Sequence, residues 1–247
     1  MRFDKVIIMI CLLCAGIFAA PAQPFRPKAP PAQSPTGLNF SGSLSTLFKD
    51  QQYFSASLTM QVAKQFGATM SVPCKMTYTE GKSRIESDFN QAKGIDSSPE
   101  MVEQIKSSGM GKTIVITRPL EHKTFTIYPE LYSYVERREA NTFDPTRVLT
   151  KVDEIGKETI GGQPCIKKTI KMAAPRSMPE EFTVWNATEL KNFPLRIEMI
   201  RSGAKVTLLF TNVVFEKPDT KLFEPPPDYV GFESVSSMLE KQARKKK

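Results

Sequence analysis

Few side chains in this sequence could carry out covalent or acid–base chemistry. The 247 residues include a single His and four Cys, which excludes a metal site built on two imidazoles, including the HExxH type. His122 follows Pro119-Leu120-Glu121, a run typical of a hairpin tip, so we interpret it as an exposed turn residue and not as a catalytic base. The acidic pair Glu180-Glu181 is expected in a loop or on a solvent-facing surface.

Two motifs that bind phosphate or activate a serine are incomplete. Gly111-Lys112-Thr113 ends like a phosphate-binding loop, but Lys106 stands where the motif needs its first glycine, and the stretch leads into a predicted strand instead of a helix. The sequence contains no GxSxG nucleophile elbow. We therefore expect no catalytic residue, no cofactor and no metal site, and we predict that the protein is not an enzyme.

Cys74 and Cys165 lie in the body of the chain, whereas Cys11 and Cys14 lie in its apolar N-terminal segment. In an exported protein a Cys74–Cys165 disulfide is permitted, and closing so long a loop would contribute roughly 4–5 kcal/mol. The sequence does not show whether the two Cα atoms come within bridging range. A bridge and two buried free thiols therefore both remain open. Neither residue belongs to a CxxC pair, so a redox role is not indicated.

The N-terminus has the three parts of a secretory signal peptide. Arg2 and Lys5 give a positive start, Val6–Ala20 is apolar, and Ala20-Pro21-Ala22 offers small residues for cleavage after Ala22. The apolar stretch is short for a membrane span, although retention as an uncleaved anchor is the alternative. We predict a periplasmic or secreted bacterial protein.

Composition divides the chain into four parts. Residues 1–22 are the predicted signal peptide, 23–36 a Pro-rich extended linker, 37–232 a β domain and 233–247 a basic tail. The net charge of +8 comes mostly from the termini, so the body is nearly neutral and lacks the basic face of a nucleic-acid binder. The tail residues that could contact an anionic membrane or cell-wall polymer are Lys241, Arg244, Lys245, Lys246 and Lys247. A solvated tail that aids solubility is the alternative.

Alternation of apolar and polar residues predicts a β-rich body. Residues 54–62 and 70–78 are apolar at every even position, and Glu80-Gly81 makes a tight turn into a third strand. Because Pro73 lacks a ladder donor, we place its strand at an edge or at a bulge. Further strands are predicted at 113–117, 123–128, 131–136, 157–160, 165–172 and 182–186.

The sequence of the last hairpin predicts which residues of its two strands are paired. Ser202-Gly203 is a two-residue turn. It would pair Met199 with Val206, Ile197 with Leu208, and Leu195 with Phe210, so that apolar side chains share one face.

Short helices are predicted at residues 44–50, 98–109 and 144–152. Together with the strands they indicate a mainly β (α+β) fold. We expect an unclosed, curled antiparallel β-barrel of about 9–11 strands, with two or three short helices covering its concave face.

Met and aromatic side chains gather on the apolar faces of these strands. A curled sheet with few helices would leave an apolar groove suited to acyl chains or an apolar peptide. The residues expected to line this groove are Phe54, Leu58, Met60, Met70, Met76, Tyr78, Met199 and Phe210. An ordinary hydrophobic core packed under the helices is the alternative.

Four motifs, in this order, resemble the LolA/LolB-like superfamily of periplasmic lipoprotein carriers and a related group of exported bacterial domains of unknown function. Together they cover roughly residues 44–230. They are the strand–turn–strand at 54–89 with Lys82-Ser83-Arg84-Ile85-Glu86, Gly156-x-Glu158-x-Ile160-x-Gly162-x-x-Cys165-x-Lys167, Trp185-Asn186-Ala187-x-x-Leu190-x-x-Phe193-Pro194 and Leu222-Phe223-x-Pro225.

The resemblance implies an unclosed antiparallel barrel with a helical lid, whose best-known members carry the acyl chains of lipoproteins between membranes. By position, Arg84 matches the strand arginine that holds the lid in the lipoprotein carrier. The sequence departs from that carrier at Ile85, where an aromatic residue is usual, and in its Pro-rich linker and lysine tail.

These observations lead to one functional hypothesis and one alternative. The leading hypothesis is an exported, non-enzymatic binding protein that holds a lipid or an acylated, lipoprotein-like ligand in the groove of a half-barrel. The alternative is a structural or interaction module of the envelope, with a fully packed core and a basic tail that contacts anionic surfaces.

Overall fold

The computed structural model describes residues 42–63, 69–94, 103, 105–138, 148–173, 179–201 and 203–245. All of them belong to one compact unit, Leu38–Lys247, and the predicted signal peptide and linker lie outside the described residues. No helix in the described ranges is long and apolar enough to cross a membrane.

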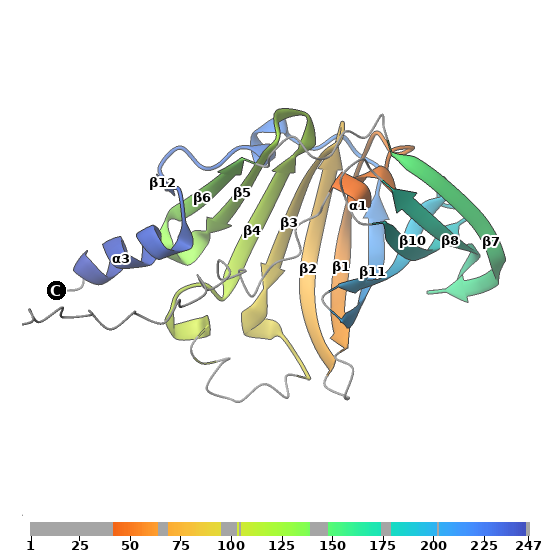
Figure 1. Cartoon of the computed structure of the whole chain (residues 1–247), viewed down its shortest axis with the longest axis horizontal. Helices are drawn as coiled ribbons and strands as arrows, with labels where there is room; N and C mark the ends of the chain where they lie inside the picture. The colour runs from red at the N-terminus through yellow and green to blue at the C-terminus, as the bar shows by residue number, and fades with distance from the viewer. Residues whose placement is uncertain are drawn as a thin grey trace, which may run out of the picture. The chain divides into compact units, whose positions relative to one another are not determined.

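A single twelve-stranded sheet dominates the described part of the chain (Figure 1). Its strands are β1 (Tyr53–Ala63), β2 (Thr69–Thr79), β3 (Lys82–Asp88), β4 (Lys112–Arg118), β5 (Lys123–Tyr128), β6 (Ser133–Arg138), β7 (Leu149–Ile160), β8 (Gln163–Ala173), β9 (Glu180–Ala187), β10 (Phe193–Arg201), β11 (Ala204–Val214) and β12 (Val230–Phe232). Across the sheet they run β12-β6-β5-β4-β3-β2-β1-β11-β10-β9-β8-β7. The short β12 pairs with β6 in parallel, and the other recorded pairs are antiparallel.

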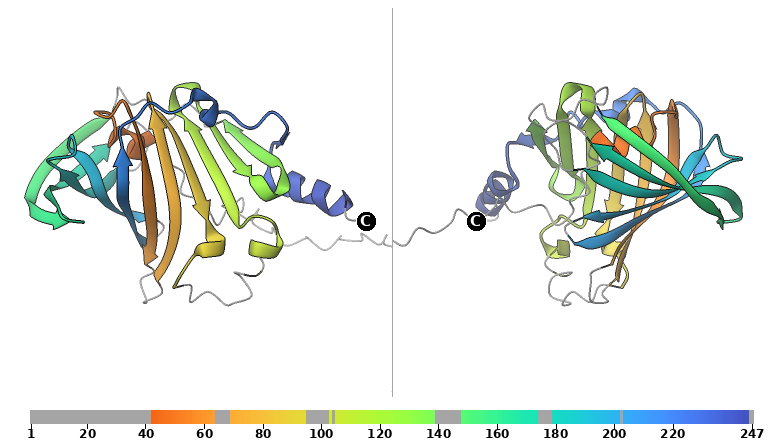
Figure 2. Two further views of the ribbon diagram at one scale, coloured as in Figure 1. Left: turned by 180° about the vertical axis from the view of Figure 1, so that it is seen from behind. Right: turned by 45° about the vertical axis from the view of Figure 1, so that its right-hand side comes forward.

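The sheet curls but does not close, because β12 and β7 are its two ends (Figures 1 and 2). This confirms the predicted mainly β, unclosed antiparallel fold. We call the side of the sheet that carries Phe54 and Met76 the inner face, and the side that carries Arg84 and Ile116 the outer face. The antiparallel registers keep these faces continuous from strand to strand, because directly opposed residues point to the same side.

Short turns set the registers. The β2–β3 turn uses Glu80 and Gly81, both at positive φ, as the sequence predicted. The β10–β11 hairpin pairs Met199 with Val206 and Ile197 with Leu208, and its recorded ladder ends with Arg196 opposite Leu209, one residue short of the third expected pair. Ser202 lies outside the described residues.

Two proline turns join β4 to β5 and β5 to β6. Each is a one-turn 3₁₀ helix, Pro119–Glu121 or Pro129–Leu131, closed by a left-handed residue, His122 or Tyr132. His122 therefore lies in the predicted turn, although it is half-buried and not exposed. The strand expected to begin at residue 131 begins at Ser133, because the turn uses the two residues before it.

Helices α1 and α3 cover the inner face at different places. Helix α1 (Gly42–Thr46) brings Leu44 into the main core beside Phe54, and it lies inside the curl in Figure 1. Helix α3 (Val235–Lys245) buries Met238 against Tyr128 and Val135 at the opposite end of the sheet.

Helix α3 contains most of the segment that the sequence predicted as a basic tail. Lys241, Arg244 and Lys245 lie on it, and Lys246 and Lys247 lie outside the described residues. Lys241 places its Nζ 5.4 Å from the ring centroid of Phe232. The segment is thus a docked helix up to residue 245, because Met238 supplies an apolar side chain that the core buries.

Two other local predictions were wrong. Residues 149–152 begin strand β7 instead of continuing a helix from residue 144, because they pair with β8. Strand β2 lies in the middle of the sheet, not at an edge, and Pro73 is tolerated there because pairing with β3 stops at Cys74. Of the helix predicted at 98–109, residues 103 and 105–107 are helical, and Gly109 at positive φ follows them.

Candidate functional site

The predicted groove residues come together on the inner face. Register pairs Leu58 of β1 with Phe210 of β11, and Phe54 of β1 with Tyr78 of β2. All but one of the eight are fully buried in the main core; Met70 is half-buried and packs against it. The buried ones are Phe54, Leu58, Met60, Met76, Tyr78, Met199 and Phe210.

Phe48 fills the centre of this surface. It follows α1, is 0% exposed, and places its ring centroid 5.2 Å from Phe54, 5.8 Å from Phe193 and 5.7 Å from Phe210. Tyr78 lies 6.0 Å from it on the remaining side. A side chain from the turn that follows α1 therefore occupies the aromatic nest that four strands build.

Polar contacts connect the segment that carries Phe48 to one strand and one turn of the sheet. Thr46 Oγ1 lies 3.0 Å from the sulfur of Met172 on β8, and Gln51 Nε2 donates to the carbonyl of Lys191 at 3.0 Å. Leu44 and Phe48 were not among the residues predicted to line the groove. Their signal was present, because Leu44, Leu47 and Phe48 have the i, i+3, i+4 spacing of one helix face.

A cavity of about 620 Å³ opens next to this nest. Ser45 and Thr46 of α1 and Lys49 of the following turn line the cavity. The other lining residues include Glu80 of the β2–β3 turn, Leu120 of the β4–β5 turn, and Lys217. Tyr78 belongs both to this cavity and to the aromatic nest. Burial raises the pKa of Tyr78, and a backbone hydrogen bond with Gly81 opposes the shift only in part, so its hydroxyl stays neutral.

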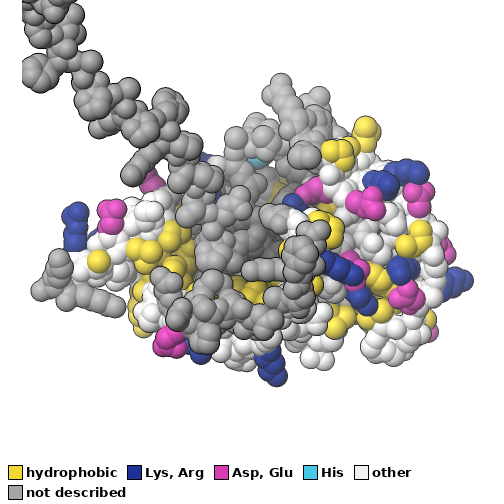
Figure 3. Space-filling model, turned by 60° about the horizontal axis from the view of Figure 1, so that its bottom comes forward, with side chains coloured by type: hydrophobic (Ala, Val, Ile, Leu, Met, Phe, Trp, Pro, Cys, Tyr) yellow, Lys and Arg dark blue, Asp and Glu magenta, His cyan; other side chains and the backbone are white. Residues whose placement is uncertain are grey.

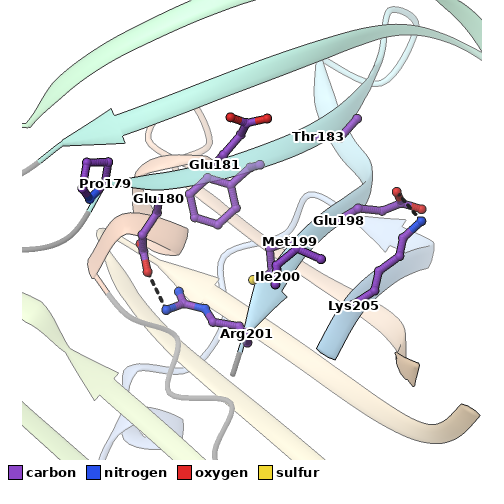
Figure 4. A pocket seen from close by; sticks show the side chains of 10 residues that line it. Pro179, Glu180, Glu181, Thr183, Glu198, Met199, Ile200, Arg201 and Lys205 are labelled. Carbon is purple, nitrogen blue, oxygen red and sulfur yellow. Dashed lines mark ion pairs between the residues drawn. The ribbon is translucent and has the colours of Figure 1, made fainter. Parts of the chain in front are cut away.

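A second cavity of about 500 Å³ lies at the ends of β9, β10 and β11. Figure 4 shows Glu180 directed at Arg201 and Glu198 directed at Lys205, with Met199 between the two ion pairs. Glu181 pairs with Lys171 at 3.1 Å. The three carboxylates of this cavity thus each face a cation, an arrangement that suits binding better than proton transfer.

Glu198 forms ion pairs with two cations. It accepts from Lys205 Nζ at 2.9 Å and also pairs with Arg196. Desolvation is the largest single influence and raises the pKa of Glu198, but the hydrogen bonds and charges of Lys205 and Arg196 together outweigh it and leave the pKa below its usual value.

Arg84 lies on the outer face and does not contact α1. Its ladder partners are Thr77 and Ile116, and its guanidinium contacts Glu86 Oε1 and the carbonyl of Leu222, each at 2.9 Å. The role implied by the resemblance, a contact that holds a lid over the inner face, therefore differs from what Arg84 does here. It holds the 3₁₀ helix Thr220–Phe223, which covers the outer face.

The possible Cys74–Cys165 disulfide does not form, since both thiols are free. Cys74 lies on β2 and Cys165 on β8, and β1, β11, β10 and β9 separate these strands in the sheet. Cys74 Sγ lies 3.3 Å from Ser87 Oγ, and Cys165 Sγ lies 3.4 Å from the carbonyl of Gln163. Of the two alternatives that the sequence left open, the structure has the free thiols.

Comparison with protein-family models and with curated proteins finds no match for this sequence. Solved structures with a similar chain path include a LolA superfamily protein of Nitrosomonas europaea, at 10% identity and a TM-score of 0.38, covering 72% of this chain and 96% of that one. The lipoprotein LppX of Mycobacterium tuberculosis matches at 11% identity and a TM-score of 0.38, covering 72% and 98%. LprF of Mycobacterium bovis matches at 13% identity and a TM-score of 0.36, covering 76% and 98%. The superfamily that the sequence resembles is thus represented among these structures.

Proposed function

We propose that this protein is an exported, non-enzymatic binding protein that holds the acyl chain of a lipid or of an acylated protein against its inner face. The observation that carries the proposal is the position of Phe48. One apolar side chain on a short segment occupies an aromatic nest in an unclosed sheet, beside a cavity of about 620 Å³. An acyl chain that enters from the cavity takes the place of this side chain.

The nest and the cavity offer complementary surfaces for an amphiphile. The nest is aromatic, whereas the cavity wall carries two cations, Lys49 and Lys217, and one carboxylate, Glu80, which leaves a net positive charge. An anionic head group would lie near these ammonium groups while the chain lies against Phe54 and Phe210. Ligand sites commonly combine a largely apolar wall with a few placed polar groups, within a volume of about 300–1,000 Å³.

Displacing Phe48 requires little backbone structure to be broken. Helix α1 has five residues, and helices this short are marginal without tertiary contacts. The hydrogen bonds after it are local, from Phe48 N–H to the carbonyl of Ser45 and from Gln51 N–H to the carbonyl of Phe48. The main cost of opening is therefore the loss of apolar contacts, which the incoming acyl chain replaces.

Lipid recovery and uptake test this proposal. Mass spectrometry of an organic extract of the purified protein should detect a lipid, and titration with a fluorescent fatty acid should show saturable binding. Phe48→Leu and Phe48→Ala should bind the probe more tightly, on the order of tenfold for the alanine, because a smaller side chain competes for the nest. Phe223→Ala is the matched control, since Phe223 is equally buried but packs on the outer face.

The proposal fails if no lipid is recovered and neither the parent protein nor the Phe48 variants take up the probe. Equal tightening by Phe223→Ala would also count against it, because the effect would then reflect general loosening of the fold.

A second candidate is an envelope interaction module with a packed core. It is favoured by the burial of the predicted groove residues, which leaves the inner face closed around Phe48. In that case α3 supplies the contact with an anionic membrane or cell-wall polymer through Lys241, Arg244, Lys245, Lys246 and Lys247. Sedimentation with anionic vesicles at low salt, with Lys241→Gln/Arg244→Gln as the variant, distinguishes this candidate from the first.

A further inference from the structure

Strand β7 is an edge strand at one end of the sheet. It pairs with β8 along one side, and no strand of the described ranges pairs with its other side. Three of its large apolar side chains are exposed, Leu149 by 77%, Val152 by 52% and Ile155 by 53%. Exposed strand edges of this length are templates for pairing with another strand. In Figure 3 the side that carries β7 and β8 shows hydrophobic side chains interspersed with charged ones of both signs.

The residues of β7 are arranged symmetrically about Val152. Leu149 and Ile155 stand three places before and after it, and Lys151 and Asp153 stand directly on either side. In an antiparallel pair with a two-fold axis at Val152, the residue at each position before the centre faces the position equally far beyond it. Lys151 of one copy then faces Asp153 of the other, and Leu149 faces Ile155.

We propose that β7 binds β7 of a second copy of this chain in antiparallel register centred on Val152. The pairing joins two Lys151–Asp153 pairs across the interface and brings the exposed apolar residues into contact with one another. Within one chain Lys151 Nζ already lies 3.0 Å from Asp153 Oδ2, so the dimer brings together four alternating charges. This inference does not depend on the proposed function.

Neighbouring registers are less favourable. Centring the pair on Lys151, Asp153 or Glu154 sets that residue opposite its own copy, and like charges directly opposed are destabilising. Charged residues on an edge strand usually prevent pairing for this reason. On β7 the alternation of sign turns the same charges into a preference for one register.

The competing register is centred on Ile155. It would set Asp153 opposite Lys157 without a like-charge contact, but it leaves Val152 opposite Glu158 and Leu149 beyond the end of the strand. It therefore matches fewer apolar residues than the register centred on Val152.

The sides of the sheet on which the β7 side chains lie, and the bulge in β7, are both compatible with the proposed register. Val152 faces Ile170 on β8, on the inner side, whereas Lys151 and Asp153 face Lys171 and Thr169 on the outer side. The β7–β8 ladder shifts between Glu154 and Gly156, so the bulge falls at Ile155, the last residue of the paired stretch, and residues 149–154 before it remain regular. Because the pairing keeps each face on its own side, the two inner faces become parts of one continuous surface.

The contact is one strand wide, which is small compared with stable dimer interfaces of about 1,200–2,000 Å². We therefore expect a reversible dimer, visible in sedimentation velocity of the exported chain as a concentration-dependent shift between micromolar and millimolar protein. Lys151→Asp should raise the dissociation constant on the order of tenfold or more, because it sets Asp opposite Asp twice. The double swap Lys151→Asp/Asp153→Lys should restore the dimer, because it re-creates both complementary pairs.

Lys157→Asp is the matched control on the same strand. It makes the same charge change outside the paired stretch and should leave the dissociation constant within about twofold of the parent value. Far-UV circular dichroism and melting temperature check that each variant is folded. A parent protein that stays monomeric up to millimolar concentration overturns the proposal. So does a dimer that Lys157→Asp disrupts and Lys151→Asp does not, since that result selects the register centred on Ile155.

Discussion

The guanidinium of Arg84 donates a hydrogen bond from Nη1 to the backbone carbonyl of Leu222 at 2.9 Å, across a sequence separation of 138 residues. The contact ties β3 to the 3₁₀ helix Thr220–Phe223. Phe223, next to Leu222, packs fully buried against Ile116 and Phe125 on the outer face. Arg84 thus helps to hold the connection that carries the chain from β11 toward α3, together with Arg118, whose Nη1 lies 2.7 Å from Glu224 Oε2.

Replacing Arg84 should therefore loosen this connection. We expect Arg84→Ala to lower the free energy of unfolding by about 1–3 kcal/mol, because a hydrogen bond from a charged side chain that is only 12% exposed is lost. Limited proteolysis should cut faster between residues 216 and 229. Arg138→Ala is the control, since Arg138 pairs with Glu136 but is 79% exposed, and such pairs contribute about 0–1 kcal/mol. Equal effects in the two variants would contradict the assigned role of Arg84.

The rim of the 620 Å³ cavity should select the charge of the ligand head group. Lys49→Glu/Lys217→Glu should weaken binding of a fluorescent fatty acid several-fold at low ionic strength and less at high salt. Binding of an uncharged fatty alcohol should not change. Lys75→Glu, on an exposed position of β2 away from the cavity, should leave both ligands unaffected. A loss of fatty-alcohol binding as well would mean that the lysines act through the fold and not through charge.

The lowered pKa of Glu198 makes a prediction about acid stability. Because this pKa is lower in the folded protein than its ordinary value of 4.5, the ionised carboxylate stabilises the fold above that value. This contribution is lost as the pH falls through the folded-state pKa. Chemical denaturation between pH 3 and pH 7 should therefore show a smaller acid-side loss of stability for Glu198→Gln than for the parent protein.

The control for this series is Glu189→Gln, which removes one carboxylate from an exposed turn after β9. If Glu198→Gln and the parent lose the same stability between pH 7 and pH 3, the ion pairs of Glu198 with Lys205 and Arg196 do not stabilise the fold.

Both thiols of the folded body should be free but slow to react. Burial is the largest influence and raises the pKa of Cys74 and of Cys165, while their hydrogen bonds oppose it only in part. Because the thiolate is the reactive form, a thiol reagent at neutral pH should label both cysteines rapidly only after unfolding. Recovery of a Cys74–Cys165 disulfide from the unreduced protein would contradict the structure.

Much of the strand content followed from local pattern. The even-position apolar residues of β1 and β2 share one face, and the Glu80-Gly81 turn joins β2 to β3, as expected. The register of Met199 with Val206 also followed, because a two-residue turn leaves one antiparallel alignment. The eight predicted groove residues were brought together for the same reason.

Other features depended on contacts between distant segments. Residues 149–152 have a helix-compatible sequence but become strand because β8 supplies ladder partners. The two cysteines share a core without meeting, because sheet order separates their strands. The basic C-terminal segment forms a helix because Met238 finds a buried position beside Tyr128 and Val135.

The sequence by itself determined the alternation, the turns and the local hairpins, because these depend on residues a few positions apart. The tertiary structure alone decided that β1 pairs with β11, that Phe48 occupies the aromatic nest, and that Arg84 faces Leu222. Each of these contacts joins surfaces whose positions exist only after the sheet has curled, so no periodicity within one segment carries them.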